Sequence, residues 1–381
     1  MDHAATTPVD PNVFQAMLPF FVGDSWGNPS SIHQDGQVAK RAMDAARDTL
    51  AGMLNADASE LIFTSGGTEA NNSALLGAAL ANNVSSGHVI VSAIEHHSVL
   101  HAAKFLNRLG FTTSVLPVDS DGMIDPAMVE HEIRHDTVLI SIMHSNNEVG
   151  SVQLIREIAE IAHNAGCLMH TDAVQSLGQI PLNVRELGVD LLSMSAHKIY
   201  GPKGCGALFV REGVPFEPLL HGGSQERERR AGTENTAAIV GMGEAVRLAA
   251  CTAIDAPARM SNLRDYMIAS ILREIPTTRI NGSATHRLPN NVNISIDNAA
   301  AEPMLLGLDL CGISASSGSA CTSGSITPSH VLLAMYGQCD RAANALRFTI
   351  GRSTQLSDVD ETVAKIVEVY NRLNTRRATR K

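Results

Sequence analysis

The sequence lacks the features that mark membrane, secreted and zinc-clip proteins. No uninterrupted apolar stretch reaches the ~20 residues that span a bilayer. The first residues, Met1-Asp2-His3-Ala4, have neither the basic nor the apolar segment of a signal peptide. The six cysteines include no CxxC pair, which argues against a zinc knuckle or a thioredoxin motif. Unpaired thiols suit a reducing compartment. We therefore predict a soluble cytoplasmic protein with no membrane partner.

Positive charge is also scarce. The chain carries 29 lysines and arginines against 39 acidic residues, a formal net charge of −10. Because binding to nucleic acid depends on neutralising phosphates with Lys and Arg, no nucleic-acid partner is expected. No GxGxxG motif follows a strand-like run, which excludes the usual dinucleotide-binding turn.

The 381 residues, 44% of them hydrophobic, are enough for two or three domains, or for one large domain with an appendage. Strand-like apolar runs alternate with helix-like stretches. This alternation indicates βαβ units and a mostly parallel sheet covered by helices on both faces. The expected strands are 61–64, 88–93, 112–116, 138–143, 168–171, 189–194 and 207–210. The expected helices are 31–54, 69–81, 99–109, 126–135, 154–165 and 174–178.

A break in the pattern near residues 247–258 suggests a domain boundary. After it, strand patterns at 291–296 and 346–350 are mixed with two expected helices, an α+β arrangement. We predict an α/β fold with a large domain at 15–250. Residues 1–14 and 251–381 would form a smaller α+β domain.

Lys198 is the most unusual charged residue of the chain. It lies in Ser195-Ala196-His197-Lys198, in a turn between two apolar strand-like runs. Burying an ammonium group is costly unless the amine loses its proton or reacts. A lysine held in such a pocket can form a Schiff base with a carbonyl, including the aldehyde of pyridoxal phosphate. The ordinary explanation, a solvated loop lysine, would suffice for this residue alone.

Further groups that pyridoxal phosphate requires follow other strands. Open parallel sheets bind ligands beyond the carboxyl ends of their strands. The segment Ser65-Gly66-Gly67-Thr68 at a helix start offers a phosphate site. A ring stacker (His96), paired amides (Asn146 and Asn147) and a carboxylate for the pyridine nitrogen (Asp172) come after three more strands. Each has an ordinary explanation as a turn, cap or surface residue, but their joint occurrence favours a cofactor site.

A second stretch, residues 315–325, consists almost entirely of small residues around Cys321. Such a segment has little to bury, so a mobile loop at about 315–330 is predicted. Cysteine is usually buried, and its place in this loop indicates an exposed, reactive thiol. A neutral surface thiol is the alternative.

These motifs resemble the cysteine desulfurases, pyridoxal-phosphate enzymes of fold type I in the class-V aminotransferase group. The resemblance runs nearly end to end and is closest to the long-loop branch that serves iron–sulfur cluster and nitrogenase assembly. It implies a large domain with a mostly parallel sheet of the seven-stranded type. The segments that carry it are 4–8, 27–31, 64–69, 95–96, 146–148, 170–175, 196–198, 221–223, 230–235, 316–324 and 347–352.

The resemblance also implies roles for single residues. The Lys198 amine would hold the aldehyde, within a cofactor-binding turn that includes Ala196, and would be catalytic together with Cys321 and His96. Substrate L-cysteine would be bound by Asn147 and by Arg352, which would grip its carboxylate. The other expected cofactor contacts are the phosphate ligands Gly67, Thr68, Ser195 and His197, the ring contacts His96, Asn147, Asp172 and Gln175, and Thr233, which would reach the partner's phosphate in a homodimer.

The implied reaction converts L-cysteine to L-alanine and leaves the sulfur on Cys321 as a persulfide. An iron–sulfur scaffold, a tRNA-thiolation protein or another carrier would accept it. Cys321 is also a candidate iron–sulfur ligand together with a partner, and no other metal ligand is expected. Three alternatives stay open: a selenocysteine lyase, another class-V aminotransferase, and a non-catalytic sulfur carrier.

Overall fold

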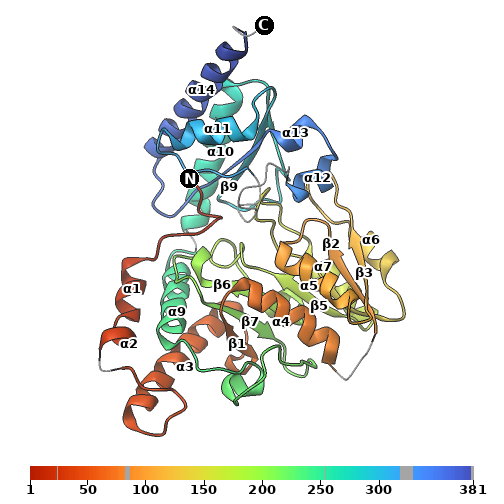
Figure 1. Ribbon diagram of the computed structural model, residues 1–381, viewed down its shortest axis with the longest axis vertical. Helices are drawn as coiled ribbons and strands as arrows, with labels where there is room; N and C mark the ends of the chain where they lie inside the picture. The colour runs from red at the N-terminus through yellow and green to blue at the C-terminus, as the bar shows by residue number, and fades with distance from the viewer. Residues whose placement is uncertain (24, 82–85, 254, 318–328, 379–381) are drawn as a thin grey trace.

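The computed structural model describes residues 1–23, 25–81, 86–253, 255–317 and 329–378 (Figure 1). Its larger sheet has seven strands in the order β1-β7-β6-β5-β4-β2-β3. Only β7 runs antiparallel to its neighbours, so β1 and β6 point the same way and the predicted, mostly parallel sheet is confirmed. The strands are β1 Leu61–Thr64, β2 His88–Ser92, β3 Thr112–Leu116, β4 Thr137–Ser141, β5 Leu168–Asp172, β6 Leu191–Ser195 and β7 Gly206–Val210.

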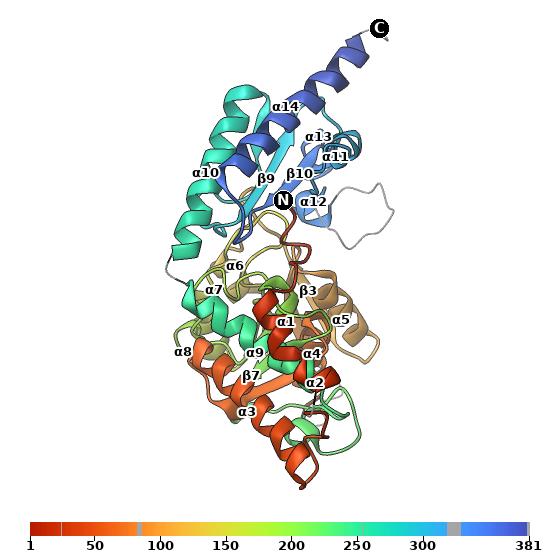
Figure 2. The ribbon, with the colours of Figure 1, turned by 90° about the vertical axis from the view of Figure 1, so that its left-hand side faces the viewer.

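Helices cover both faces of this sheet. Alternate residues of a strand face opposite ways, so Leu61 and Phe63 join one core with α3 and α9, while Ile62 joins the other with α4 and α5. Burial on both faces explains why the strands read as continuous apolar runs. Figure 2 shows the sheet between these layers. The helices are α1 Pro11–Met17, α2 Pro19–Val22, α3 Gln34–Leu54, α4 Gly67–Leu80, α5 His97–Asn107, α6 Pro126–Glu132, α7 Ile155–Asn164, α8 Val184–Leu187 and α9 Thr236–Cys251.

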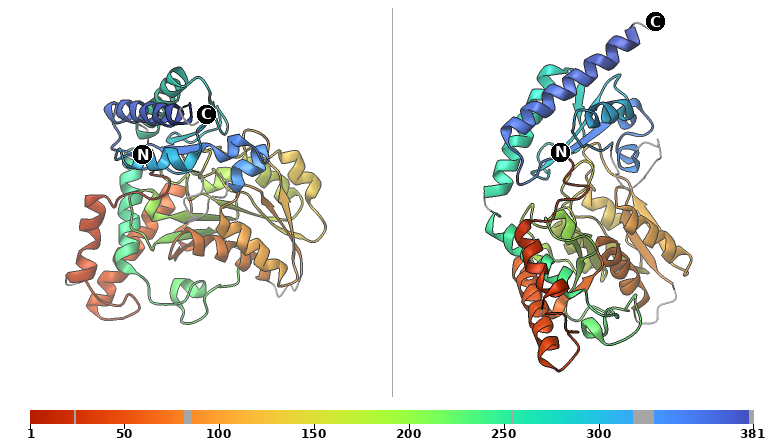
Figure 3. Two further views of the ribbon diagram at one scale, coloured as in Figure 1. Left: turned by 45° about the horizontal axis from the view of Figure 1, so that its top comes forward. Right: turned by 60° about the vertical axis from the view of Figure 1, so that its left-hand side comes forward.

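A second sheet, antiparallel and in the order β10-β9-β8, has a core of its own with α10, α11 and α14 (Figure 3). The two sheets thus have separate cores, while the predicted boundaries at residues 14/15 and 250/251 stay a prediction; α1 runs across the first of them and places Val13 in the core of the large sheet. The strands are β8 Thr278–Ile280, β9 Asn291–Ile296 and β10 Ala345–Thr349. The helices are α10 Asp255–Glu274, α11 Ala301–Asp309, α12 His330–Tyr336, α13 Asp340–Ala343 and α14 Leu356–Ala378.

Two expectations about helices were wrong. Residues 174–178 form successive turns, because the Val174 amide donates to Asp172 Oδ1 and Gly178 takes a left-handed φ of 70°. The described part of the second domain holds five helices rather than two. Of these, α12 and α13 have seven and four residues, too few to give a periodic pattern.

The N-terminal arm connects the two sheets. Asp2 forms a β-bridge with Thr349, the last residue of β10, and the Ala4 amide donates to Thr349 Oγ1. A few residues later, Thr7 bonds to the turn after β6 through its amide and hydroxyl, which both donate to the His197 carbonyl. In Figures 1 and 2 the N-terminus lies between the two domains. The arm therefore contacts both domains where they meet.

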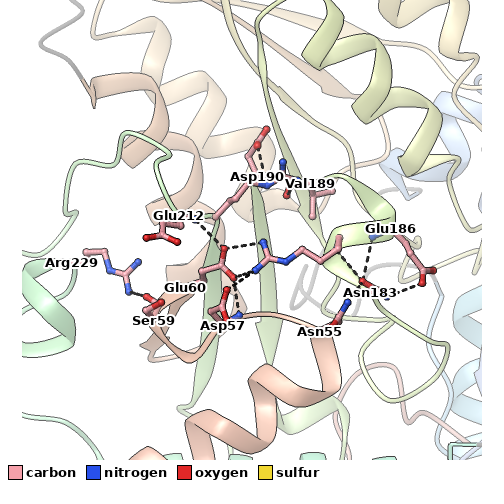
Figure 4. A network of polar contacts seen from close by, with 12 residues as sticks. Asn55, Asp57, Ser59, Glu60, Asn183, Glu186, Val189, Asp190, Glu212 and Arg229 are labelled. Atoms are coloured by element: carbon pink, nitrogen blue, oxygen red, sulfur yellow. Dashed lines mark hydrogen bonds and ion pairs between the residues drawn. The ribbon is translucent and has the colours of Figure 1, made fainter.

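A polar network lies at the amino-terminal end of β1 in the large sheet (Figure 4). The Arg185 guanidinium donates to both carboxylate oxygens of Glu60, at 3.0 and 2.5 Å, and to Asp57. Burial alone would raise the pKa of Glu60, but its bond with Arg185 lowers it below the ordinary value. Glu60 directly precedes β1, so this network lies at the opposite end of β1 from its carboxyl end, where the phosphate site is expected. Among the residues described, no single helix is long and apolar enough to cross a membrane, although α9 and α10 pass the same test as a pair bent by 75°.

Candidate active site

A cavity of about 220 Å³ lies at the carboxyl ends of β1, β2, β4, β5 and β6. Its walls come from the strand ends, from the N-terminal arm and from β10 of the smaller domain. The topology thus brings the expected cofactor groups together, although they are far apart in the sequence. The lining residues are Ala4, Ala5, Gly67, Thr68, Asn71, His96, Ser98, Met143, Asn147, Asp172, Val174, Gln175, Ser195, His197, Lys198 and Arg347.

Lys198 is half-buried in a single turn of 3-10 helix that follows β6. Its Nζ donates to the carbonyls of Ala4 and Ala5, at 2.5 and 2.8 Å. Gln175 Nε2 donates to the same Ala4 carbonyl at 3.1 Å. The arm that orients the amine is 194 residues away in sequence, which is why sequence reasoning did not assign it this task.

The N-terminal end of α4 provides the anion site. A Cβ atom on Gly67 would come within 2.7 Å of Val174 Cγ2, so only glycine fits this position without a shift. Burial, with help from the Lys198 and Lys203 charges, lowers the pKa of His197 to about 4. At neutral pH this imidazole is uncharged and serves as a hydrogen-bonding group. Together with the first-turn amides of α4, these residues suit a phosphate.

Asp172 belongs to a hydrogen-bonded chain that crosses the cavity wall. Its Oδ2 accepts from Asn71 Nδ2 at 2.7 Å, and the same amide nitrogen donates to Ser98 Oγ at 2.8 Å. Ser98 Oγ lies 2.7 Å from His96 Nδ1. Sequence reasoning missed Asn71 and Ser98. The one available signal was a polar residue on the apolar face of α4.

The two buried glutamates next to the site residues have raised pKa values. Burial raises the pKa of Glu95, beside His96, to about 8 and that of Glu148, beside Asn147, to about 7. Asn146 is also buried, and it is committed to backbone bonds with Ile94, Glu148 and Val149. Of the two adjacent amides, only Asn147 therefore lines the cavity.

The structure corrects the expectation for Arg352. Its guanidinium donates to Asp10 Oδ2 at 2.8 Å and lies 4.0 Å from the centre of the Tyr200 ring, away from the cavity lining. Arg347, five residues earlier on β10, lines the cavity instead. It donates to the Asn147 carbonyl and to Asp2 Oδ1, and its Nε is buried without a partner among the described residues.

Two other expected site residues, Thr233 and Ala196, are not among the described residues that line this cavity. Thr233 is exposed and borders a separate hollow of about 190 Å³ beside Ser65 and Arg230, so any role toward a partner chain stays a prediction. Ala196 is fully buried, and its backbone amide donates to the Cys205 carbonyl. Cys321 and most of the predicted 315–330 loop lie outside the described residues.

Comparisons with known proteins agree with this arrangement. The model of the family described as aminotransferase class-V matches residues 1–362. A protein of Dictyoglomus turgidum named cysteine desulfurase IscS is 47% identical over 98% of this chain and 95% of its own length. A solved structure titled NifS-like protein has a TM-score of 0.91 at 35% identity, covering 97% of this chain and 98% of its own. Another, titled SspA in complex with cysteine, has a TM-score of 0.81 at 37% identity, covering 92% of this chain and 97% of its own.

Proposed function

The chain belongs to the aminotransferase class-V family and is a cysteine desulfurase, and we propose that it uses pyridoxal phosphate to convert L-cysteine to L-alanine, with the sulfur held on Cys321. One observation carries this proposal. The lysine, the buried carboxylate and the glycine-bearing helix N-terminus that such an enzyme needs line one cavity, in a chain 47% identical to a cysteine desulfurase.

The residues present fit the cofactor. Gly67 packs closely against Val174, and the first turn of α4 borders a hollow that Thr68, Ser195 and His197 also line, where a phosphate would be held. Asp172, only 5% exposed, offers a carboxylate to the pyridine nitrogen, and Lys198 Nζ offers the amine. When bound, pyridoxal phosphate supplies an aldehyde that joins to amines and a protonated ring that withdraws electrons from the substrate Cα.

The chain's own residues then handle the protons. Lys198 Nζ takes the proton from the substrate Cα, which requires the amine to lose its own proton well below its reference pKa of about 10.4. The two arm carbonyls that accept from Nζ fix where this amine points. With the cofactor bound, Asp172 would hold the ring nitrogen in its protonated form. His96 would stack on the ring and shuttle a proton, and Asn147 and Gln175 would contact the ring oxygen.

Cys321 removes the sulfur. Its thiolate attacks the substrate Sγ, a sulfur–sulfur bond forms and the Cβ–S bond breaks, leaving the electron pair on the three-carbon fragment. Protonation of that fragment gives alanine. The balance is one thiol and one cysteine converted to one persulfide and one alanine, with no outside oxidant or reductant.

Arg347 takes over the role first expected of Arg352. Arg347→Lys should raise KM for L-cysteine by about ten- to a hundredfold, because a charged hydrogen bond to the substrate carboxylate is lost. Arg352→Lys, the matched control at the same residue type, should leave KM nearly unchanged. Steady-state kinetics, with circular dichroism to verify folding, makes the comparison. A KM effect in Arg352→Lys alone would contradict the assignment.

The activity itself is tested on the purified full chain with added pyridoxal phosphate. Alanine should form from L-cysteine, with one sulfur released per alanine in the presence of a thiol reductant. Parallel assays use L-selenocysteine, and an amino acid with a 2-oxo acid acceptor. Turnover of selenocysteine alone, transamination without alanine release from cysteine, or no cofactor absorbance at all would replace the proposal by the lyase, the aminotransferase or the non-catalytic carrier.

Three further points are proposals supported by the family resemblance. The chain forms a homodimer in which Thr233 approaches the partner's phosphate. It delivers sulfur to an iron–sulfur scaffold or another acceptor protein. It acts in the cytoplasm.

A further inference from the structure

A short chain of hydrogen bonds connects the carboxylate and the imidazole of the active site. Asn71 Nδ2 donates its two protons to Asp172 Oδ2 and Ser98 Oγ. Ser98 Oγ lies 2.7 Å from His96 Nδ1, and because the Ser98 backbone N–H makes this ring nitrogen an acceptor, the Ser98 hydroxyl donates to it as well. The Ser98 backbone amide donates to the same ring nitrogen at 3.1 Å. Nδ1 therefore accepts from two donors, and the proton of neutral His96 resides on Nε2.

Packing alone does not explain Asn71. It is 1% exposed, and its neighbours on the buried face of α4, Ala70, Ala74 and Leu75, are apolar. Its Oδ1 is buried without a partner among the described residues, which costs stability. A residue retained only for the core would be apolar here. The bond to the buried carboxylate of Asp172 is what an apolar residue would lose.

We propose that Asn71 and Ser98 are positioning residues that couple Asp172 and His96 into one unit. Asn71 holds the carboxylate that faces the ring nitrogen, and through Ser98 the same amide holds the imidazole that stacks on the ring. This inference rests on the proposed function, because it assigns these two contacts to pyridoxal phosphate. It goes beyond that function because it names two residues through which the Asp172 contact with the cofactor depends on the His96 contact.

The test measures cofactor affinity, which does not depend on cysteine turnover. Apo-protein is titrated with pyridoxal phosphate for the wild type, Asn71→Ala, Ser98→Ala and the double variant. Asn71→Ala should raise Kd about tenfold or more, since a bond to a charged group is lost, and Ser98→Ala should raise it several-fold. The double variant should fall clearly short of the product of the two factors, because both substitutions break one chain.

Asn72→Ala is the matched control. Asn72 is the adjacent amide on α4, and its Nδ2 donates only to backbone carbonyls, those of Thr68 and Ser98. Its Kd should equal that of the wild type. Ser98→Thr keeps the hydroxyl that Ser98→Ala removes, and it should bind pyridoxal phosphate about as tightly as the wild type. If Asn71→Ala does not fold, Asn71→Leu is measured instead, since it removes the donor and keeps a branched side chain with the same number of heavy atoms.

The outcomes separate this inference from the proposed function. Multiplicative effects in the double variant, an unchanged Kd in Asn71→Ala, or failure of Ser98→Thr to restore binding would overturn the coupling even if cysteine is turned over. Coupled Kd changes in a protein that forms no alanine from cysteine would support the positioning role and overturn the desulfurase reaction. A lower melting temperature with unchanged Kd would show a merely structural role and overturn the inference.

Discussion

Replacing Lys198 by alanine should abolish both covalent cofactor binding and turnover. The amine at this position is expected to join to the cofactor aldehyde and to take the Cα proton, so one substitution removes a nucleophile and a base. Removing a general base alone costs roughly 10²–10⁴-fold in rate. We expect alanine formation from L-cysteine to fall by at least that factor, and the absorbance of the covalently bound cofactor to disappear.

Borohydride reduction followed by peptide mapping gives the decisive measurement. The wild type should carry a pyridoxyl group on Lys198, and the alanine variant should carry none. Lys104→Ala, which removes an exposed lysine from α5, is the control and should keep both the adduct and the activity. An adduct mapped to another lysine of the wild type would refute the assignment and, with it, the proposed chemistry.

The Cys321→Ser variant should separate cofactor binding from sulfur removal. A serine hydroxyl is too weakly acidic to replace a thiolate as the acceptor of sulfur. Cofactor absorbance and Kd should stay as in the wild type, because all the described cavity residues are unchanged. Alanine production should drop by roughly a hundredfold or more, as expected when an enzyme loses its nucleophile.

Labelled sulfur identifies the site directly. After incubation with L-cysteine carrying labelled sulfur, the wild type should bear a label that dithiothreitol releases, and Cys321→Ser should bear none. Cys339→Ser and Cys251→Ser remove exposed thiols elsewhere and should behave as the wild type. Normal alanine formation by Cys321→Ser would rule out the persulfide mechanism and favour a lyase in which this cysteine is incidental.

Much of the large domain could be predicted because its signals are local. A strand buried on both faces is apolar throughout, so strands such as β1 and β7 stand out from the helices between them, whereas the edge strand β3 is partly exposed and begins with two threonines and a serine. Open parallel sheets bind ligands beyond the carboxyl ends of their strands, which is why the residues that follow the strands were chosen. Of these, residues 67, 68, 96, 147, 172, 175, 195, 197 and 198 line one cavity. Residues 174–178 failed as a helix because a side-chain bond from Asp172 and a left-handed Gly178 favour turns, which periodicity does not detect.

The choice between Arg347 and Arg352 depended on the tertiary structure. Both lie in the segment that the family resemblance covers, and their residue type gives no reason to prefer either. In the structure, Arg347 belongs to β10 and bonds to the Asn147 carbonyl 200 residues away. Arg352 follows the strand and pairs with Asp10. Only the pairing of β10 with β9, and its approach to the large sheet, decides which arginine reaches the cavity.

The amino-acid sequence by itself determined the class of fold and pointed to most of the residues that line the cavity, because hydrophobic period and turn chemistry depend on neighbouring residues. The tertiary structure decided how those groups are held. Carbonyls of the N-terminal arm orient Lys198, and Asn71 and Ser98 connect Asp172 to His96. Apart from the bond between His96 and Ser98, these contacts join segments far apart in the chain, and a hydrogen bond across such a separation leaves no local pattern. Such a bond forms only when the packing of the whole fold brings its two partners within reach.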